Sequence, residues 1–270
     1  MNEVSLEWVV LLGGALIAFG CSSGSGATGG SGGSAGVGGM GGSAGAGGAG
    51  GAGGVTPVTE YAENFESLDQ SSATALSDDP HPEWGDGWLV FGNVFEPDGT
   101  YIGGYGPDPA PNNTGAFSGI ALEQGGPEQG DQVLVVISDY NNTEEQDAGN
   151  LVEGNTFRLR EITAGDVGKT LSFSFDAKRG NINDPDDPLC PCDSTAFAFI
   201  RTVNQDTFEL TNDVTEDTTT LPITWGRYEI SLEIGSDLIG QGLQFGFSGT
   251  ATNSEPSGVF YDNILVVTTE

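Results

Sequence analysis

Hydrophobic and polar positions alternate over many short stretches between residue 57 and the last residue of the chain. A period of two is the pattern of a half-buried β-strand, and Gly, Pro, Asn and Asp between such stretches indicate turns. No segment has a convincing helical period. The expected strands include residues 87–95, 117–124, 131–140, 156–162, 169–178, 195–203, 207–210 and 225–234.

Residues 243–267 predict the two final strands, the first of which alternates through Leu243, Phe245 and Phe247. The second is almost wholly apolar, and two registers fit it. One register turns inward Phe260, Ile264 and Val266, with Asp262 among them. The other turns inward Val259, Tyr261, Leu265 and Val267, with Asn263 among them. Either register places a polar side chain in an apolar row, where an unpaired charge is very costly.

Roughly ten short strands separated by Gly- and Pro-rich turns predict an all-β fold of the β-sandwich type. No Pro/Gly/Ser linker divides residues 57–270, so we expect one domain there. Residues 96–115 and 181–193 have no strand pattern and are expected to be long, irregular loops.

The N-terminal 56 residues differ from the rest. Residues 8–20 are an apolar run that is too short to span a bilayer and fits the core of a secretory signal, residues 1–20. Residues 22–55 are almost wholly Gly, Ala and Ser, which predicts a disordered, flexible tether with a reach on the order of 30 Å.

The sequence Ala18-Phe19-Gly20-Cys21 resembles the lipobox of bacterial lipoproteins, although the family usually has Leu at the position of Ala18. This resemblance implies that Cys21 is lipidated and begins a linker, residues 21–56. It also implies that the protein is exported and anchored to a bacterial membrane by lipid alone, at the outer membrane or cell surface. The alternative is an ordinary cleaved signal with an incidental cysteine.

The charge balance is extreme, with 7 Lys and Arg against 39 Asp and Glu, a formal net charge of −32. Such a surface repels phosphate backbones, so nucleic acid is excluded as a partner. Two compatible explanations remain for the acidity. The carboxylates either form a solvated surface, or some of them converge on divalent cations.

Cys190 and Cys192 lie together in a Pro- and Asp-rich loop. In an exported protein they are candidates for a disulfide, although a bridge across one residue is geometrically tight. Two loop thiols without function are the alternative. A zinc site needs further ligands, and the chain has a single histidine, His81, so zinc is not expected.

Three segments of the domain resemble carbohydrate-binding modules of the jelly-roll, galactose-binding-like type. They are NFES at residues 64–67, WGRYEISL at 225–232 and GVFYDNI at 258–264. The resemblance implies a jelly-roll β-sandwich in which Glu66 and Asp262 meet where the first and last strands pair and help to bind a structural calcium. Carboxylate oxygens are the ligands that Ca²⁺ prefers. An arginine paired with Asp262 is the alternative.

Sugar binding needs aromatic faces for stacking, with amides or carboxylates nearby for the hydroxyl groups. The candidate ligand-binding residues are Trp84, Tyr101, Tyr105, Tyr140, Asn141 and Asn142. Each of the aromatic residues could instead pack at the rim or in the core. We expect Trp88, at the start of an apolar strand, and Trp225 to be core residues.

These observations together favour a lipid-anchored surface protein whose β-sandwich binds polysaccharide or a cell-surface glycan without chemistry and is stabilised by calcium. The alternatives are a structural or adhesive surface protein and a polysaccharide-degrading enzyme. A lone histidine between two prolines disfavours a Ser-His-Asp arrangement. Carboxylate pairs suited to glycoside hydrolysis are uninformative in so acidic a chain.

Overall fold

The computed structural model describes residues 56–68, 87–109, 117–137, 143–184, 194–251 and 258–270. These residues form twelve β-strands, one short helix, α1 (Thr143–Ala148), and one 3₁₀ turn, η1 (Ser236–Leu238). Neither helical element is long and apolar enough to cross a membrane. The predicted signal peptide, residues 1–20, and most of the predicted linker, residues 21–56, lie outside the described residues.

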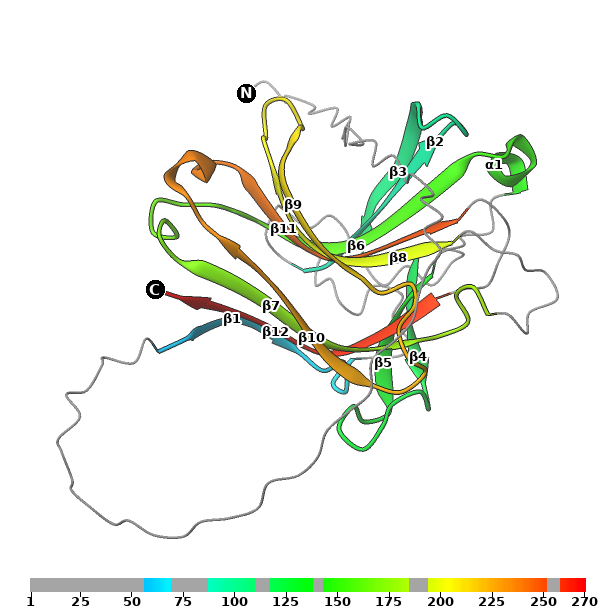
Figure 1. The fold of residues 1–270 in the computed structure, drawn as a ribbon, viewed down its shortest axis with the longest axis horizontal. Coiled ribbons are helices and arrows are strands. Elements are labelled where there is room, and N and C mark those ends of the chain that lie inside the picture. The colour runs from blue at the N-terminus through cyan, green and yellow to red at the C-terminus, as the bar shows by residue number, and fades with distance from the viewer. Residues whose placement is uncertain (1–55, 69–86, 110–116, 138–142, 185–193, 252–257) are drawn as a thin grey trace, which may run out of the picture. The chain divides into compact units, whose positions relative to one another are not determined.

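The strands form two antiparallel sheets (Figure 1). Sheet I contains β1 (Val58–Glu63), β4 (Ser118–Leu122), β5 (Gln132–Ile137), β7 (Thr170–Arg179), β10 (Gly226–Glu233) and β12 (Gly258–Thr269). β12 lies in the middle of this sheet, with β7 along one side. Its other side is shared by two strands placed end to end, because β5 pairs with the first part of β12 and β1 with the second. The first and last strands therefore pair, as the resemblance implied.

Sheet II has the strand order β3-β2-β6-β11-β8-β9. Its members are β2 (Leu89–Phe95), β3 (Tyr101–Pro109), β6 (Leu151–Glu161), β8 (Thr195–Val203), β9 (Leu210–Asp217) and β11 (Gly242–Ala251). In Figure 1 the long strands of this sheet curve so that the side facing away from sheet I, here called the outer face of sheet II, is concave.

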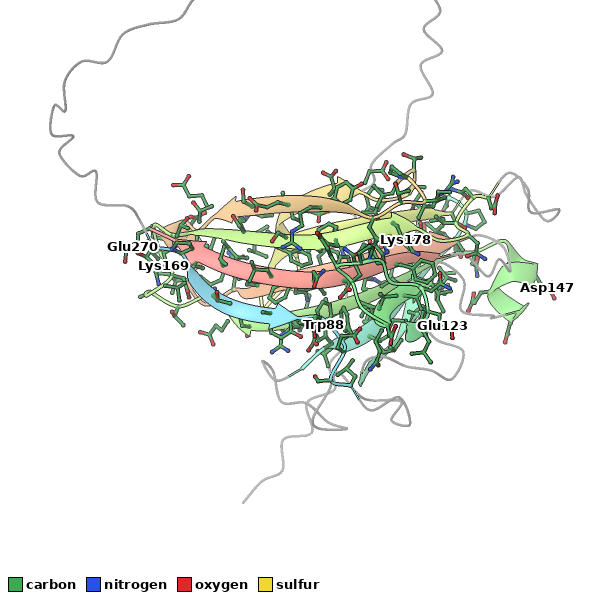
Figure 2. The ribbon with its side chains drawn as sticks, turned by 90° about the horizontal axis from the view of Figure 1, so that it is seen from below. Trp88, Glu123, Asp147, Lys169, Lys178 and Glu270 are labelled. Carbon is green, nitrogen blue, oxygen red and sulfur yellow. The ribbon has the colours of Figure 1, made fainter. Side chains whose placement is uncertain are left out.

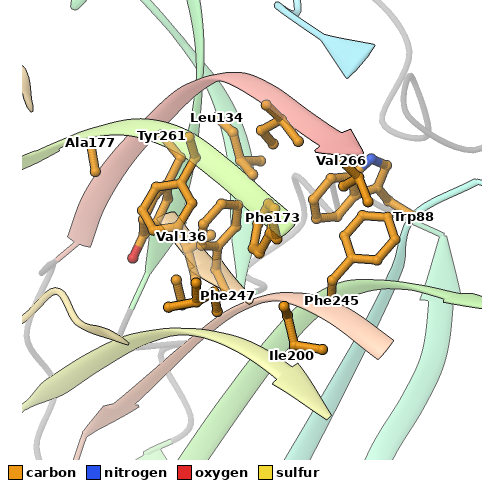
Figure 3. Close-up of a cluster of buried hydrophobic side chains, with 14 of the residues drawn as sticks. Trp88, Leu134, Val136, Phe173, Ala177, Ile200, Phe245, Phe247, Tyr261 and Val266 are labelled. Atoms are coloured by element: carbon orange, nitrogen blue, oxygen red, sulfur yellow. The ribbon is translucent and has the colours of Figure 1, made fainter. Parts of the chain in front are cut away.

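The core lies between the two sheets and is rich in aromatic rings (Figure 3). Phe247 of β11 stacks on Tyr261 of β12 with ring centroids 3.6 Å apart, and Phe173 of β7 lies 5.4 Å from Phe247. Trp88 stacks on the same Phe247 and is fully buried, as predicted. Burying each such ring contributes about 2–3 kcal/mol, so this cluster is a main source of stability.

A β-bulge in β12 resolves the choice between the two registers. Val259 and Tyr261 point into the core, and so do Ile264 and Val266, which belong to the other register. The change occurs between Asp262 and Leu265, where the pairing with β7 shifts by one residue. Asn263 takes up the extra residue in the left-handed conformation, at φ 46°. Each predicted register is therefore correct for one half of the strand.

The β-sandwich prediction is confirmed, and most predicted strands are found close to their expected bounds. β8 spans the predicted residues 195–203, whereas β6 begins earlier than expected. Two predictions are wrong. β3 lies inside residues 96–115, which were expected to be irregular. The strand predicted at 207–210 is instead a turn, where Asn204 Oδ1 accepts the backbone N–H groups of Asp206 and Thr207, and β9 follows it.

Candidate functional site

The first candidate site surrounds Asp262 in β12. This side chain is 0 % exposed, which is unusual for a carboxylate. Its Oδ1 accepts the backbone N–H of Asn263 at 2.6 Å, a bond that the bulge makes available. Its Oδ2 is buried and has no hydrogen-bond partner. A buried polar atom in this condition costs about 1–3 kcal/mol, and more when it is charged.

Asp176 lies directly across from Asp262 on β7. In contrast to Asp262, its carboxylate is well satisfied. It accepts hydrogen bonds from Gln129 Nε2 at 2.7 Å, from Asn263 Nδ2 at 2.8 Å and from Arg227 Nη1 at 3.1 Å. Arg227 thus pairs with Asp176, and the ion pairs of the described residues include none to Asp262. The alternative of an arginine-paired Asp262 is not what the structure contains.

Glu66 lies in the turn that follows β1, after the strained residue Phe65 at φ 60°. Its Oε1 accepts the backbone N–H groups of Asp131, at 2.8 Å, and Gln132, at 2.7 Å, at the start of β5. Glu66 and Glu63 lie near enough to Asp262 for their charges to raise the pKa of its carboxyl, and Asp176 pairs with it across the sheet. We call these four residues the Asp262 cluster: Glu63, Glu66, Asp176 and Asp262.

The electrostatics of this cluster are unfavourable for an ionised Asp262. The pKa of its carboxyl is raised from 3.8 to about 7: burial is the largest cause, and the negative charges of Asp176, Glu66 and Glu63 act in the same direction, against the lowering effect of the Asn263 N–H. Among the described residues, no cation contacts Asp262 to counteract the rise in its pKa.

One observation favours a calcium ion at this site, and another shows that the described side chains alone do not complete its coordination. The buried, unpartnered Oδ2 of Asp262 is an anionic oxygen without a counter-charge, which a hard cation would supply. However, the described residues contain no group of three or more His, Cys, Asp or Glu side chains placed to hold a metal ion. Glu66 and Asp262 would thus need backbone carbonyls or water to complete the coordination. An open cavity of about 500 Å³, lined partly by Glu63, Asn64, Arg227 and Asn263, adjoins the bulge.

The second candidate site is the outer face of sheet II. In β2, Val90 and Val94 belong to the core, so the alternate residues Phe91 and Asn93 point to the opposite side. There Phe91 belongs to a separate apolar cluster made of Leu89, Phe91, Phe157, Leu159 and Phe199. This cluster was not predicted from the sequence, because alternation identifies two faces without saying that both are apolar.

A chain of polar side chains crosses this face beside the phenylalanine rings. We call it the outer-face network; its members are Asn93, Glu153, Asn155, Arg201 and Asp213. Arg201 lies 4.0 Å above the ring of Phe199 and donates from Nε to Asp213 Oδ1 at 2.9 Å. The network is mostly buried, and Asn93 Oδ1 has no hydrogen-bond partner. Aromatic rings with a few convergent polar groups are typical of a ligand site.

The sugar-binding residues predicted from sequence are placed only in part. Tyr101 is half-buried at the start of β3 and meets the ring of Phe95 edge-on, with centroids 5.8 Å apart. Tyr105 lies in the same strand, opposite Gly92, but its side chain is outside the described set. The other predicted site residues are also outside it: Trp84, Tyr140, Asn141, Asn142, Cys21, Cys190 and Cys192.

Trp225 is not a core residue, contrary to the prediction. It is half-buried at the outer face of sheet I, which Figure 2 shows from outside. Its Nε1 donates to the carbonyl of Gln124 at 3.3 Å, and that carbonyl also accepts a 2.6 Å bond from Lys178 Nζ. The ammonium lies 5.2 Å from the ring centroids of both Trp225 and Phe260. Trp225 immediately precedes β10, where the loop after β4 holds it outside the sandwich.

Comparisons with known proteins show similarity in fold alone. No protein-family profile and no curated protein sequence matches the chain. A cyclase from Fischerella sp. TAU is 12% identical, with a TM-score of 0.43, over 79% of this chain and 98% of the cyclase. The C-terminal family 22 carbohydrate-binding module of Clostridium thermocellum Xyn10B is 13% identical, with a TM-score of 0.35, over 77% of this chain and 92% of the module. The bacteriophage CBA120 tailspike protein 4 enzymatically active domain is 10% identical, with a TM-score of 0.35, over 55% of this chain but only 17% of that protein.

Proposed function

We propose that this chain is a lipid-anchored surface protein whose β-sandwich binds a glycan on the outer face of sheet II without catalysing a reaction. The observation that carries the proposal is the outer-face network beside a cluster of phenylalanine rings, on the side of the sheet that the core does not use. A buried polar network adds little net stability compared with apolar packing. Its polar groups are, however, of the kind that bind hydroxyl groups.

The catalytic alternative needs two carboxylates that face each other across a cleft. The pair formed by Asp176 and Asp262 does not meet this requirement. The two residues pair on neighbouring strands of one sheet rather than across a cleft, and Asp176 is already held by three hydrogen-bond donors. We therefore favour binding over hydrolysis.

Two further parts of the proposal concern the anchor and the metal. Export and lipidation at Cys21 rest on the leader and its lipobox resemblance. A structural calcium at Asp262 and Glu66 is supported by the unpartnered Oδ2 and by the absence of a cation beside Asp262 in the described chain. Such an ion would bind only the folded protein and would stabilise it by mass action.

A matched pair of substitutions tests the binding face. Phe91→Leu removes an aromatic ring from the outer face of sheet II, and Phe260→Leu makes the same change on the outer face of sheet I. On a glycan array and in affinity electrophoresis, we expect the wild type and Phe260→Leu to bind the same glycan and Phe91→Leu to lose it. Equal binding by all three proteins would place the site elsewhere, first at Tyr101 and Tyr105. The absence of any ligand for the wild type would refute the proposal.

A further inference from the structure

The pairing within sheet I leaves a gap beside the bulge in β12. β1 pairs with β12 only as far as Ile264, and β5 pairs with it only as far as Tyr261. Asp262 and Asn263 therefore have no neighbouring strand on that side. The open cavity of about 500 Å³ lies at this gap, and we call it the bulge cavity. Its volume is within the range of small-molecule sites, about 300–1,000 Å³.

One wall of the bulge cavity is the guanidinium of Arg227, which reaches across β7 from β10. Its Nη1 donates to the carbonyl of Asn263 at 2.6 Å and to Asp176 Oδ1 at 3.1 Å, and its Nη2 donates to Ser174 Oγ at 2.7 Å. These bonds use three of the five N–H donors of an arginine and hold the planar group in place. The side chain is 44 % exposed, and its remaining two N–H donors have no partner among the described residues. Arg227 can therefore donate to a ligand without giving up its own contacts.

The other wall is the end of β1 and the turn that follows it, with Glu63, Asn64 and Ser67. Glu63 is half-buried, and its Oε1 accepts the backbone N–H groups of Asn64, at 3.0 Å, and Phe65, at 2.7 Å. Its Oε2 has no hydrogen-bond partner in the described part of the chain. This wall thus supplies an anionic acceptor that the turn holds in place, whereas the wall of Arg227 supplies donors.

An apolar floor lies between the two walls. Ala62 of β1 pairs with Leu265 of β12, and both line the bulge cavity. Leu265 faces the outer side of sheet I, because its neighbours Ile264 and Val266 point into the core. A small apolar surface between hydrogen-bonding groups suits a sugar ring, which presents C–H groups on its faces and hydroxyl groups at its edge.

The charges of the two walls favour an uncharged ligand. The charge of Arg227 is already compensated by Asp176 at 3.1 Å, so an anion would gain little from it and would be repelled by Glu63. A cation would be attracted by Glu63 but repelled by Arg227. A hydroxyl group both donates and accepts, so a ligand with several hydroxyl groups can bond to both walls.

We infer that the bulge cavity is a second ligand site, for an uncharged monosaccharide or the end of an oligosaccharide: Arg227 donates to one of its hydroxyl groups, and Glu63 Oε2 accepts from another. This site lies on sheet I, and it does not depend on the proposed glycan face on sheet II. Few hydrogen bonds in an open cavity give weak binding, so the test requires titration in solution.

The first test titrates the isotope-labelled full chain with glucose, galactose and mannose, and follows its backbone amides by NMR. We expect at least one of these sugars to shift the amides of Asn64 and Asn263 saturably. The uronic acid and the amino sugar derived from it should bind roughly tenfold more weakly. Tighter binding of either charged sugar, or no saturable shift with any neutral sugar, overturns the inference.

The second test places a ring in the bulge cavity from an exposed position of β1. Ala62→Phe should lower the affinity for the sugar at least tenfold, whereas Thr59→Phe, in the same strand but outside the cavity, should not. Both positions are exposed, so the fold should tolerate both rings, which a melting curve checks. Undiminished binding by Ala62→Phe overturns the inference.

The third test removes the anionic acceptor. In Glu63→Gln the amide oxygen can still hold the turn, but the amide nitrogen in place of Oε2 cannot accept, so the affinity should again fall roughly tenfold. Glu233→Gln, at an exposed position of β10, is the control for the loss of one charge. Equal binding by Glu63→Gln and the wild type overturns the inference. Phe91→Leu should keep this site intact, so failure here and failure of the proposed glycan face are distinguishable.

Discussion

Ionisation of Asp262 should make the metal-free protein less stable as the pH rises. The pKa of this group is 3.8 in an unfolded chain and about 7 in the folded one. Between these values the folded state holds a proton that the unfolded state has released, so the free energy of unfolding falls as the pH increases. Below the window both states are protonated, and above it both are ionised, with the full cost present.

The size of the effect follows from the width of that window. The shift from 3.8 to about 7 spans roughly three pKa units, and each unit corresponds to about 1.4 kcal/mol. Asp262 is 0 % exposed, so the surrounding water does not screen the charge of its carboxylate. Above about pH 7, the ionised carboxylate should therefore lower the free energy of unfolding by about 4 kcal/mol. The free energy of unfolding of a typical domain is roughly 5–15 kcal/mol, so this cost is a large fraction of it.

Asp262→Asn isolates this term, since asparagine has nearly the same shape and does not ionise. Urea denaturation in EDTA should show the variant gaining on the wild type by roughly 3 kcal/mol between about pH 5 and about pH 8. Glu233→Gln, which removes one charge from an exposed position of β10, controls for the general acidity of the chain and should show no such gain. If the difference between Asp262→Asn and the wild type stays constant with pH, the reasoning about burial is wrong.

Calcium adds a second arm to this experiment. At about pH 8, Ca²⁺ should raise the melting temperature of the wild type, whereas Mg²⁺ should not, because Mg²⁺ requires stricter geometry and gives up its water reluctantly. Asp262→Asn should not respond to either ion. A wild-type melting temperature that is insensitive to both EDTA and Ca²⁺ would exclude the structural metal while leaving the pH prediction intact.

Three further outcomes are expected. Cys21→Ala should move the protein from the membrane fraction to the soluble fraction, and unchanged fractionation would show that the leader has been misinterpreted. Trp88→Phe removes the 2.8 Å hydrogen bond from Nε1 to Tyr61 Oη and should lower the free energy of unfolding in urea by about 1–3 kcal/mol, whereas a loss below about 0.5 kcal/mol would contradict this. At Asn263, where φ is 46°, both Ala and Gly forfeit the side-chain bond to Asp176, but Gly should cost about 1 kcal/mol less; an equal loss would mean that the backbone there is not strained.

The sequence predicted those strands in which alternation is regular and the residues favour strands, such as β7 and β8. β3 was missed because it contains Gly103, Gly104 and two prolines, residues that ordinarily indicate turns. It forms nevertheless as an edge strand, paired only with β2. The bulge could not be predicted, because one extra residue in β12 changes the register without altering the apolar character of the sequence.

The candidate sites were predictable to different degrees. Asp262 was identified because a charged residue in an apolar row conflicts with its neighbours. Its partner Asp176 gave no such signal, since it occupies a polar position of an alternating strand, where a solvated side chain looks the same. Asn93 and Arg201 were not identified for the same reason, because their contacts join strands that are far apart in the sequence.

The central position of β12 has a consequence for the order of folding. This strand is the last in the chain, yet it pairs with β1, β5 and β7, so most of sheet I cannot close until the final residues are available. β1 and β12 are separated by almost the whole domain, a high contact order that slows folding. A chain emerging from the ribosome would therefore remain open at least until β12 has been synthesised. That delay is compatible with the proposed export, in which the chain would cross a membrane unfolded.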